Sequence, residues 1–254
     1  MKLPHDCLKQ AQRRAYLWYA LATTIWALGI RFASARYPGS FDWAYTVISA
    51  LASRKHNPEG AAWFASAIVG AMLCLWPVVT RLTRDGFAGK SSPRWVKVAL
   101  RIGVVCGTFV GVERLVFYHF SDLVHKGHEL VALIAFLSFY AGVLGLYAHR
   151  VRVRRTFLIP AVIAVVPLLS IGCRELFLYL AQRHVGWADY NWRAHGTPLW
   201  FSFAWWQWLA AGLLWLSVGH LLVTASEGQG FTKLWSCPRN TRMTLKQVRV
   251  EEKL

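Results

Sequence analysis

Apolar residues are concentrated in six blocks, and each block is about as long as a bilayer is thick. The blocks cover residues 16–34, 61–80, 98–118, 130–148, 157–180 and 199–223. A helix needs about 20 apolar residues to cross the hydrocarbon core. The two most apolar blocks do not alternate between apolar and polar residues, as the strands of a β-barrel would. Backbone amides in hydrocarbon must bond within their own segment, so the pattern predicts an all-α membrane bundle of six transmembrane helices.

The composition also argues against a soluble protein. The 254 residues are 56% apolar, and only 16% are charged. Soluble domains carry roughly 25% charged residues. We therefore expect a multi-pass protein of the cell membrane.

Lysine and arginine gather in alternate loops, and this asymmetry predicts the orientation. The two tails and the loops after the second and fourth blocks contain 19 of these residues, whereas the other loops contain six. Because positive residues stay on the cytoplasmic side, both termini are predicted to be cytoplasmic. The expected organisation is a basic tail (1–15), a six-helix domain (16–223) and a second basic tail (224–254).

The net charge of +17 is explained by these tails and loops. Anionic lipid at the inner surface is a sufficient partner for them, and no nucleic acid is needed. One alternative concerns the first block, which ends in the small residues "ASA" at 33–35. This ending resembles a signal-peptide cleavage site, so removal of residues 1–35 stays open.

The outer loops collect the polar residue types that carry chemistry. The clearest stretch is "HFSDLVHKGHE" at 119–129. Its side chains could act as general acid and base, or some of them could bind a divalent metal such as Zn. The acid–base candidates are His119, Asp122, His125 and Glu129, and the metal candidates are His125, Asp122 and His128. The alternative is a polar helix start with an N-cap at Ser121 or Asp122.

The first outer loop contains "WAYTVISALAS" at 43–53, which is too short to span a membrane. We expect it to form an interfacial or re-entrant helix. Arg54, His56 and Asn57 follow it and suit an anionic headgroup, because they offer charged and amide donors. The alternative is a solvated loop whose basic residues anchor it at the interface.

Two short motifs place charges inside apolar blocks. "GVERLVFY" carries Glu113 and Arg114, and "GCRELFLY" carries Arg174 and Glu175 in reversed order. Both lie at similar depth in spans that run the same way, so we expect structural ion pairs between them, with Glu113 facing Arg174. Arg114 and Glu175 would then turn toward the outer loops. Gln207, slightly deeper, would join the site. The alternative is a purely structural ion pair that fixes the register of the two helices.

The first outer loop is similar to that of an uncharacterised family of multi-span prokaryotic membrane proteins. The similarity rests on "YPG" at 37–39 and on matching residues after it: Thr46, Ile48, Ser49, Leu51, Asn57 and Pro58. Ala50 stands where this family has Asp, which removes any role of that carboxylate. The resemblance implies a six-span bundle. A more distant likeness to the Frag/DRAM group implies a link to lipid.

The function predicted from these residues is recognition or modification of a polar lipid headgroup at an extracytoplasmic pocket. Its ligand-binding residues would be Arg54, His56, Asn57, Arg114, Arg174 and Gln207. Alkaline-ceramidase-like hydrolases are a more distant comparison, because only His220 stands in the last span where that group has paired histidines. The alternatives are a transporter that uses the intramembrane charges and a scaffold without catalysis.

Reporter fusions test the predicted orientation, in which both termini are cytoplasmic. Fusions after Arg84, Arg152 and Glu227 should report a cytoplasmic location, because basic segments are retained inside. Fusions near Asn57 and Lys126 should report an external location. A reversed pattern would place the histidines inside and contradict an extracytoplasmic site.

Overall fold

The computed structural model describes residues 5–84, 92–117, 127–186 and 196–227, and these residues form helices and no strand. The α-helices are α1 (His5–Ala35), α2 (Ile48–Leu51), α3 (Ala61–Arg84), α4 (Arg94–Val116), α5 (Gly127–Val151), α6 (Leu158–Gln182) and α8 (Phe203–Glu227). The 3-10 helices η2 (Arg155–Phe157) and η4 (Leu199–Phe201) precede α6 and α8. The predicted all-α class is confirmed.

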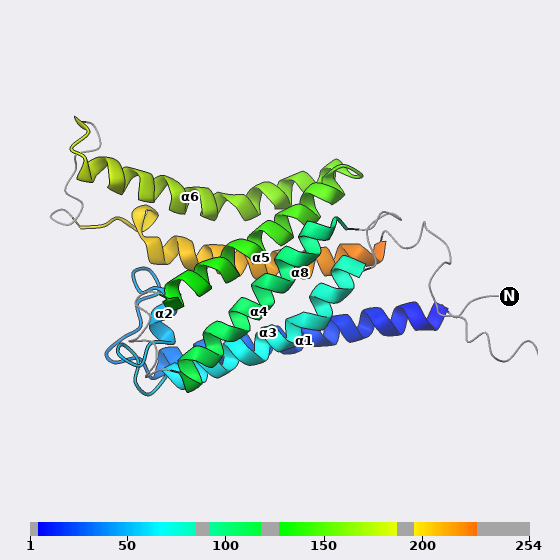
Figure 1. Cartoon of the computed structure of the whole chain (residues 1–254), viewed down its shortest axis with the longest axis horizontal. Coiled ribbons are helices and arrows are strands. Elements are labelled where there is room, and N and C mark those ends of the chain that lie inside the picture. The colour runs from blue at the N-terminus through cyan, green and yellow to red at the C-terminus, as the bar shows by residue number, and fades with distance from the viewer. Residues whose placement is uncertain (1–4, 85–91, 118–126, 187–195, 228–254) are drawn as a thin grey trace, which may run out of the picture.

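Successive long helices run in opposite directions (Figure 1). α1, α4 and α6 point one way, and α3, α5 and α8 point the other way. The start of α1 and the end of α8 therefore lie at the same end of the bundle, which we call the tail end. α2 lies at the opposite end, which we call the α2 end.

Five helical segments are long and apolar enough to cross a membrane, as predicted. They are Ala61–Arg84, Arg94–Val116, Gly127–Val151, Arg155–Gln182 and Phe203–Ala225. α1 is also long, with 31 residues, but it is not one of the five. Arg31 and the basic residues of its first turns reduce its apolar character. Because α1 begins at His5, it also includes most of the segment predicted as a separate tail.

Glycines let α4 pack closely against both of its neighbours. A Cβ at Gly103 would lie 2.8 Å from the ring of Phe139 on α5. A Cβ at Gly111 would lie 2.8 Å from the carbonyl oxygen of Ala65 on α3. Gly107, between them, faces α3 as well, with a Cβ position 3.0 Å from a methionine sulfur. Small residues at such contacts are the usual means by which membrane helices approach one another.

Aromatic side chains attach α8 to α1 and α5. The rings of Trp215 and Trp26 stack with centroids 5.1 Å apart. The hydroxyl of Tyr19 on α1 donates to the carbonyl oxygen of Trp215 at 2.9 Å. From α5, the hydroxyl of Tyr140 donates to the carbonyl oxygen of Ala210 at 2.9 Å. These bonds satisfy the polar tips of large side chains inside an apolar bundle.

α6 lies on the outside of the bundle, against α8 and α5 (Figure 1). Only Ala164 and Pro167 are buried on it. A Cβ at Gly172 would meet nothing within 4 Å. Most of the core therefore lies between the other long helices.

The interfacial helix predicted for "WAYTVISALAS" is wrong in its extent. Only Ile48–Leu51 is helical, and the flanking residues form turns. Side chains of α8 hold this backbone instead: Oε1 of Gln207 accepts from the Ile48 N–H at 3.0 Å. The indole N–H of Trp208 donates to the carbonyl oxygen of Thr46 at 3.0 Å. These tertiary bonds replace the bonds that a longer helix would make within itself.

The glycine contact between α4 and α5 can be tested with a matched pair of substitutions. Gly103→Ala should lower the free energy of unfolding by about 1–3 kcal/mol, because the new methyl group overlaps Phe139. Gly172→Ala should cause no loss, since its Cβ has open space and alanine is the better helix former. Thermal unfolding of the purified proteins in detergent measures both. Equal stability of the two variants would contradict the packing described.

Candidate functional site

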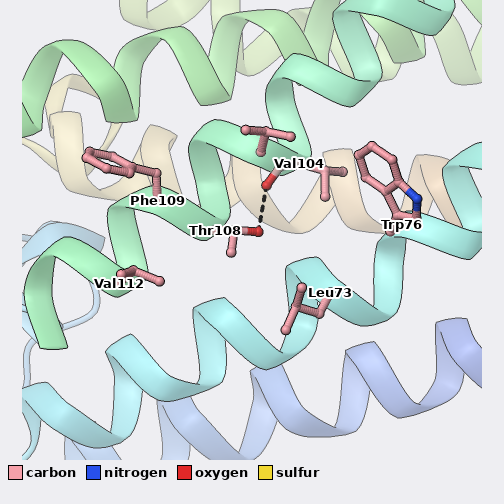
Figure 2. Close-up of a pocket in the computed structure, with 7 residues that line it drawn as sticks. Leu73, Trp76, Val104, Thr108, Phe109 and Val112 are labelled. Atoms are coloured by element: carbon pink, nitrogen blue, oxygen red, sulfur yellow. Dashed lines mark hydrogen bonds between the residues drawn. The ribbon is translucent and has the colours of Figure 1, made fainter. Parts of the chain in front are cut away.

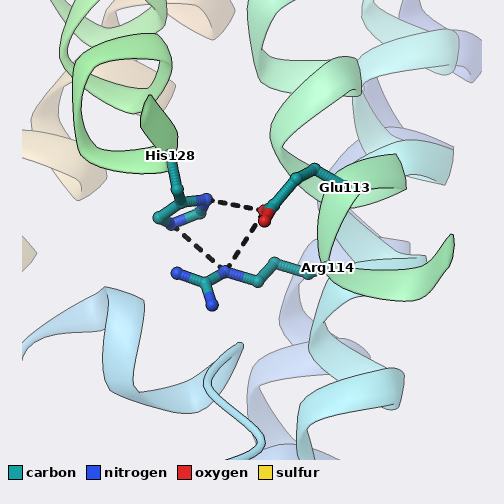
Figure 3. A network of polar contacts seen from close by, with 3 residues as sticks. All are labelled: Glu113, Arg114 and His128. Carbon is teal, nitrogen blue, oxygen red and sulfur yellow. Dashed lines mark hydrogen bonds and ion pairs between the residues drawn. The ribbon is translucent and has the colours of Figure 1, made fainter. Parts of the chain in front are cut away.

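Glu113, Arg114 and His128 form a polar cluster at the α2 end, where α4 ends and α5 begins (Figure 3). We call it the α4–α5 cluster. Nδ1 of His128 lies 2.9 Å from Oε2 of Glu113. Nε of Arg114 lies 3.3 Å from Nε2 of His128 and 3.4 Å from the same Glu113 oxygen. An arginine nitrogen only donates, so Nε2 of His128 accepts its hydrogen bond. The ring hydrogen is therefore on Nδ1, which donates to Oε2 of Glu113.

One oxygen of the cluster has no hydrogen-bond partner among the residues that the structure describes. Glu113 is 9% exposed, and its Oε1 is buried without a hydrogen bond from any residue that the structure describes. Leaving a buried polar group unpaired costs about 1–3 kcal/mol, and more if the group is charged. Folded proteins seldom leave such atoms unpaired outside functional sites. Oε1 is therefore the acceptor of this cluster that no described residue uses.

Arg54 reaches the same helix end from the loop after α2. Its guanidinium donates to the carbonyl oxygen of Leu115 at 3.3 Å. Leu115 lies in the last turn of α4, where carbonyl groups lack helical partners and carry the negative end of the helix dipole. The structure thus places two predicted ligand-binding residues, Arg54 and Arg114, at one helix end.

The predicted ion pair between Glu113 and Arg174 is wrong. Arg174 pairs with its own neighbour Glu175, and its Nε donates to the carbonyl oxygen of Phe201 at 2.9 Å. Its guanidinium also lies 5.5 Å and 5.6 Å from the ring centroids of Phe201 and Phe203. Cation–π contacts and a backbone acceptor thus stabilise this charge without Glu113.

The reason for this error is the order of the helices around the bundle. α4 packs against α3 and α5, whereas α6 packs against α8 and α5 (Figure 1). The similar depth of the two motifs was predicted from the sequence, but depth does not make two helices neighbours. Arg114 and Glu175, which were expected to turn toward the outer loops, instead pair with their own neighbours Glu113 and Arg174.

Most of the predicted metal-binding and acid–base residues lie outside the residues that the structure describes. His119, Asp122 and His125 lie outside the described residues. Glu129 is exposed in the first turn of α5. Both ring nitrogens of His128 already face protein groups. Within the described part of the chain, no three His, Cys, Asp or Glu side chains group in a way that could hold a metal.

Asn57 has a structural role in place of the predicted ligand-binding role. It is fully buried, and its amide nitrogen donates to the carbonyl oxygens of Ala33 at 3.0 Å and Leu51 at 3.2 Å. Its Oδ1 accepts from the Gly60 N–H at 3.1 Å. One side chain therefore joins the end of α1, α2 and the start of α3.

Two other predicted ligand-binding residues do not join the α4–α5 cluster in the ways expected. The Oε1 of Gln207 holds the backbone of α2, so this oxygen has a structural role. The side chain of His56 is exposed, next to the buried Asn57. Of the predicted set, Arg54 and Arg114 remain together with Glu113.

A polar cluster at the tail end was not predicted from the sequence. Arg150 lies within α5 and is only 2% exposed. Its guanidinium donates to the hydroxyl of Thr224 and lies 5.6 Å from the ring centroid of Phe157. The hydroxyl of Tyr147, one turn earlier, lies 3.1 Å from Nδ1 of His220. The signal available in the sequence was His220 and Thr224, two polar residues four apart in the last span.

Comparisons with known proteins add little to this geometry. No protein-family model matches the chain, and no solved structure matches it. A stretch of 58 residues is 34% identical to the small conductance calcium-activated potassium channel-like protein 3 of Caenorhabditis elegans. The stretch covers 23% of this chain and 8% of that protein, so the similarity is partial.

The role of Asn57 predicts a large effect on stability. Asn57→Ala should lower the free energy of unfolding by about 3 kcal/mol or more, because three buried backbone groups lose their partner. His56→Ala is the matched control, and its effect should stay within about 0.5 kcal/mol since the side chain is exposed. Thermal unfolding in detergent measures both variants. A small effect of Asn57→Ala would mean that water replaces the lost bonds.

Proposed function

We propose that this chain is a six-span protein of the cell membrane that binds a polar lipid headgroup at the α4–α5 cluster. The observation that supports this function is the buried Oε1 of Glu113, which has no hydrogen-bond partner among the described residues. An ionisable residue inside a membrane span is costly to keep, and such residues usually serve function. Five helices with the length and apolar character of spans support the membrane location.

The chemistry of the cluster suggests which headgroup it binds. The free oxygen of Glu113 accepts an N–H or O–H group of the ligand. Arg114, with Arg54 at the same helix end, provides positive charge for a phosphate. A headgroup that carries both a phosphate and an ammonium group with N–H donors, as phosphoethanolamine does, uses all three residues.

Modification of the ligand would need further residues from the same loop. His119, Asp122 and His125 follow Arg114 within eleven positions of the chain, and Glu129 adjoins His128. We propose these as general acid and base, because they flank the cluster in sequence. Zinc binding by His125, Asp122 and His128 would require Nε2 of His128 to exchange its contact with Arg114 for the metal, while Nδ1 could keep its bond to Glu113.

The orientation belongs to the same proposal. The basic tails and the basic loops at the tail end are cytoplasmic, where anionic lipid attracts them. α1 then serves as the sixth span, since it runs antiparallel to α3 along the bundle (Figure 1). The α4–α5 cluster is consequently extracytoplasmic. The likeness of residues 37–60 to a family of multi-span membrane proteins agrees with this arrangement.

Lipid retention tests the headgroup site. The full chain is purified in detergent with an equimolar mixture of phosphatidylethanolamine and phosphatidylcholine, and bound lipid is counted by native mass spectrometry. The unmodified chain should retain phosphatidylethanolamine preferentially, because the choline group has no N–H donor for Glu113. Glu113→Gln should reduce that preference about tenfold, as expected for loss of a charge-assisted bond.

Glu175→Gln is the matched control, since it removes an exposed carboxylate on another helix. It should leave the preference unchanged. If the unmodified chain shows no preference, or if Glu113→Gln retains it, Glu113 does not bind a headgroup.

Transport is the second candidate function, because Glu113 and His128 form a buried proton-accepting pair within candidate spans. Such pairs occur along proton paths in transporters. Uptake of a radiolabelled headgroup compound into vesicles, driven by a pH gradient, distinguishes transport from binding alone. A scaffold without chemistry would instead tolerate alanine at His119, His125 and Glu175.

A further inference from the structure

An apolar groove of about 340 Å³ lies between α3 and α4, away from the α4–α5 cluster (Figure 2). Two helices that are held together by glycine contacts elsewhere form its walls. Seven residues line it: Leu73, Trp76, Val104, Val105, Thr108, Phe109 and Val112.

The groove is apolar even at its one hydroxyl-bearing residue. The hydroxyl of Thr108 donates to the carbonyl oxygen of Val104 at 2.8 Å, one turn earlier (Figure 2). This internal bond satisfies the hydroxyl and leaves methyl groups to form the wall. Leu73 and Phe109 remain at least half exposed, so apolar surface is open to the surroundings of the bundle. In a membrane those surroundings are hydrocarbon chains.

Positive charge lies at one end of the groove. The guanidinium of Arg101 is 5.9 Å from the ring centroid of Trp76, which is part of the groove wall. Lys97 and Arg94 precede Arg101 by four and seven residues, so they lie on the same side of α4. From Arg101 onward this side is apolar as far as Val112.

The length of this face matches one leaflet. Arg101 and Val112 are eleven residues apart, which is about 16 Å along a helix. Half of a hydrocarbon core of about 30 Å is about 15 Å.

We propose that this groove binds an acyl chain of an anionic phospholipid whose phosphate is held by Arg101. The apolar wall contacts the chain, and the basic end of α4 contacts the headgroup. The site differs from the α4–α5 cluster in position and in ligand charge, and it does not depend on the function proposed there. Arg101 and Glu113 are twelve residues apart on α4, or about 18 Å.

Competition between two lipids tests the proposal. The full chain is purified in detergent with an equimolar mixture of phosphatidylglycerol and phosphatidylcholine, and bound lipid is counted by native mass spectrometry. The unmodified chain should retain phosphatidylglycerol in preference to phosphatidylcholine. Arg101→Gln should reduce that preference about tenfold, because a charged phosphate contact is lost.

A matched pair of tryptophan substitutions tests the contribution of the groove to lipid binding separately from that of the Arg101 charge. Val105→Trp fills the groove and should abolish retention of the preferred lipid. Val162→Trp is the control, since Val162 is 54% exposed and Val105 is 56% exposed, but Val162 lies on α6 and does not line the groove. It should retain lipid as the unmodified chain does. Thermal unfolding verifies that each variant is folded.

Each outcome either supports or overturns the proposed lipid site. Loss of lipid in Val105→Trp and Arg101→Gln, but not in Val162→Trp, supports the site. Equal retention of the two lipids by the unmodified chain would overturn the choice of an anionic ligand. Unchanged retention in a folded Val105→Trp protein would overturn the groove as the binding place. The phosphatidylglycerol preference of the groove and the phosphatidylethanolamine preference of the α4–α5 cluster are measured separately, so failure at either site is distinguishable from failure at the other.

Discussion

The close approach of α4 to both α3 and α5 is the constraint on which the rest of this bundle depends. It exists because Gly103, Gly107 and Gly111 carry no side chain where the neighbouring helices pass. With α5 held against α4, the start of α5 lies beside the end of α4. His128 is therefore brought to Glu113, and the α4–α5 cluster follows from the packing of the helices.

The same packing explains how charges are accommodated in this apolar molecule. Since α4 and α6 are not neighbours, their charged motifs are stabilised locally. Arg174 uses aromatic rings and a backbone oxygen, and Arg150 uses a ring and a hydroxyl group. Both arginines keep polar or π-electron partners, which lowers the cost of removing their charge from water. Glu113 differs from these arginines, because one of its two oxygens has no partner among the described residues.

The helices could be predicted from the sequence because bilayer thickness and backbone hydrogen bonding constrain each segment separately, and both constraints can be recognised along the chain. The block predicted at 61–80 became α3, and the block at 130–148 became α5 with only a few more residues at each end. Which helices are neighbours depends on where small residues meet in space, and spacing along the chain does not reveal that. Glu113 and Arg114 were therefore identified correctly as interior charges, but the partner of Glu113 was not.

The role of Asn57 likewise could not be predicted from its residue type alone. Its residue type suited a ligand as well as a structural role. The decisive clue was its position three residues before Gly60, at the start of α3, where asparagine commonly caps a helix by accepting such an N–H. The polar residues of this loop were predicted to face a ligand, whereas burial shows that Asn57 belongs to the scaffold.

The attachment of the α2 segment to α8 has a consequence for how the chain is made. Ile48 and its hydrogen-bond partner Gln207 are 159 positions apart. Ribosomes add about 5–20 residues per second, so roughly 10–30 s pass between synthesis of the two ends of this bond. During that interval the α2 segment lacks the α8 side chains that hold its backbone. The last long helix to be made thus completes the loop that follows the first one, and a chain released before α8 lacks the partners of that loop.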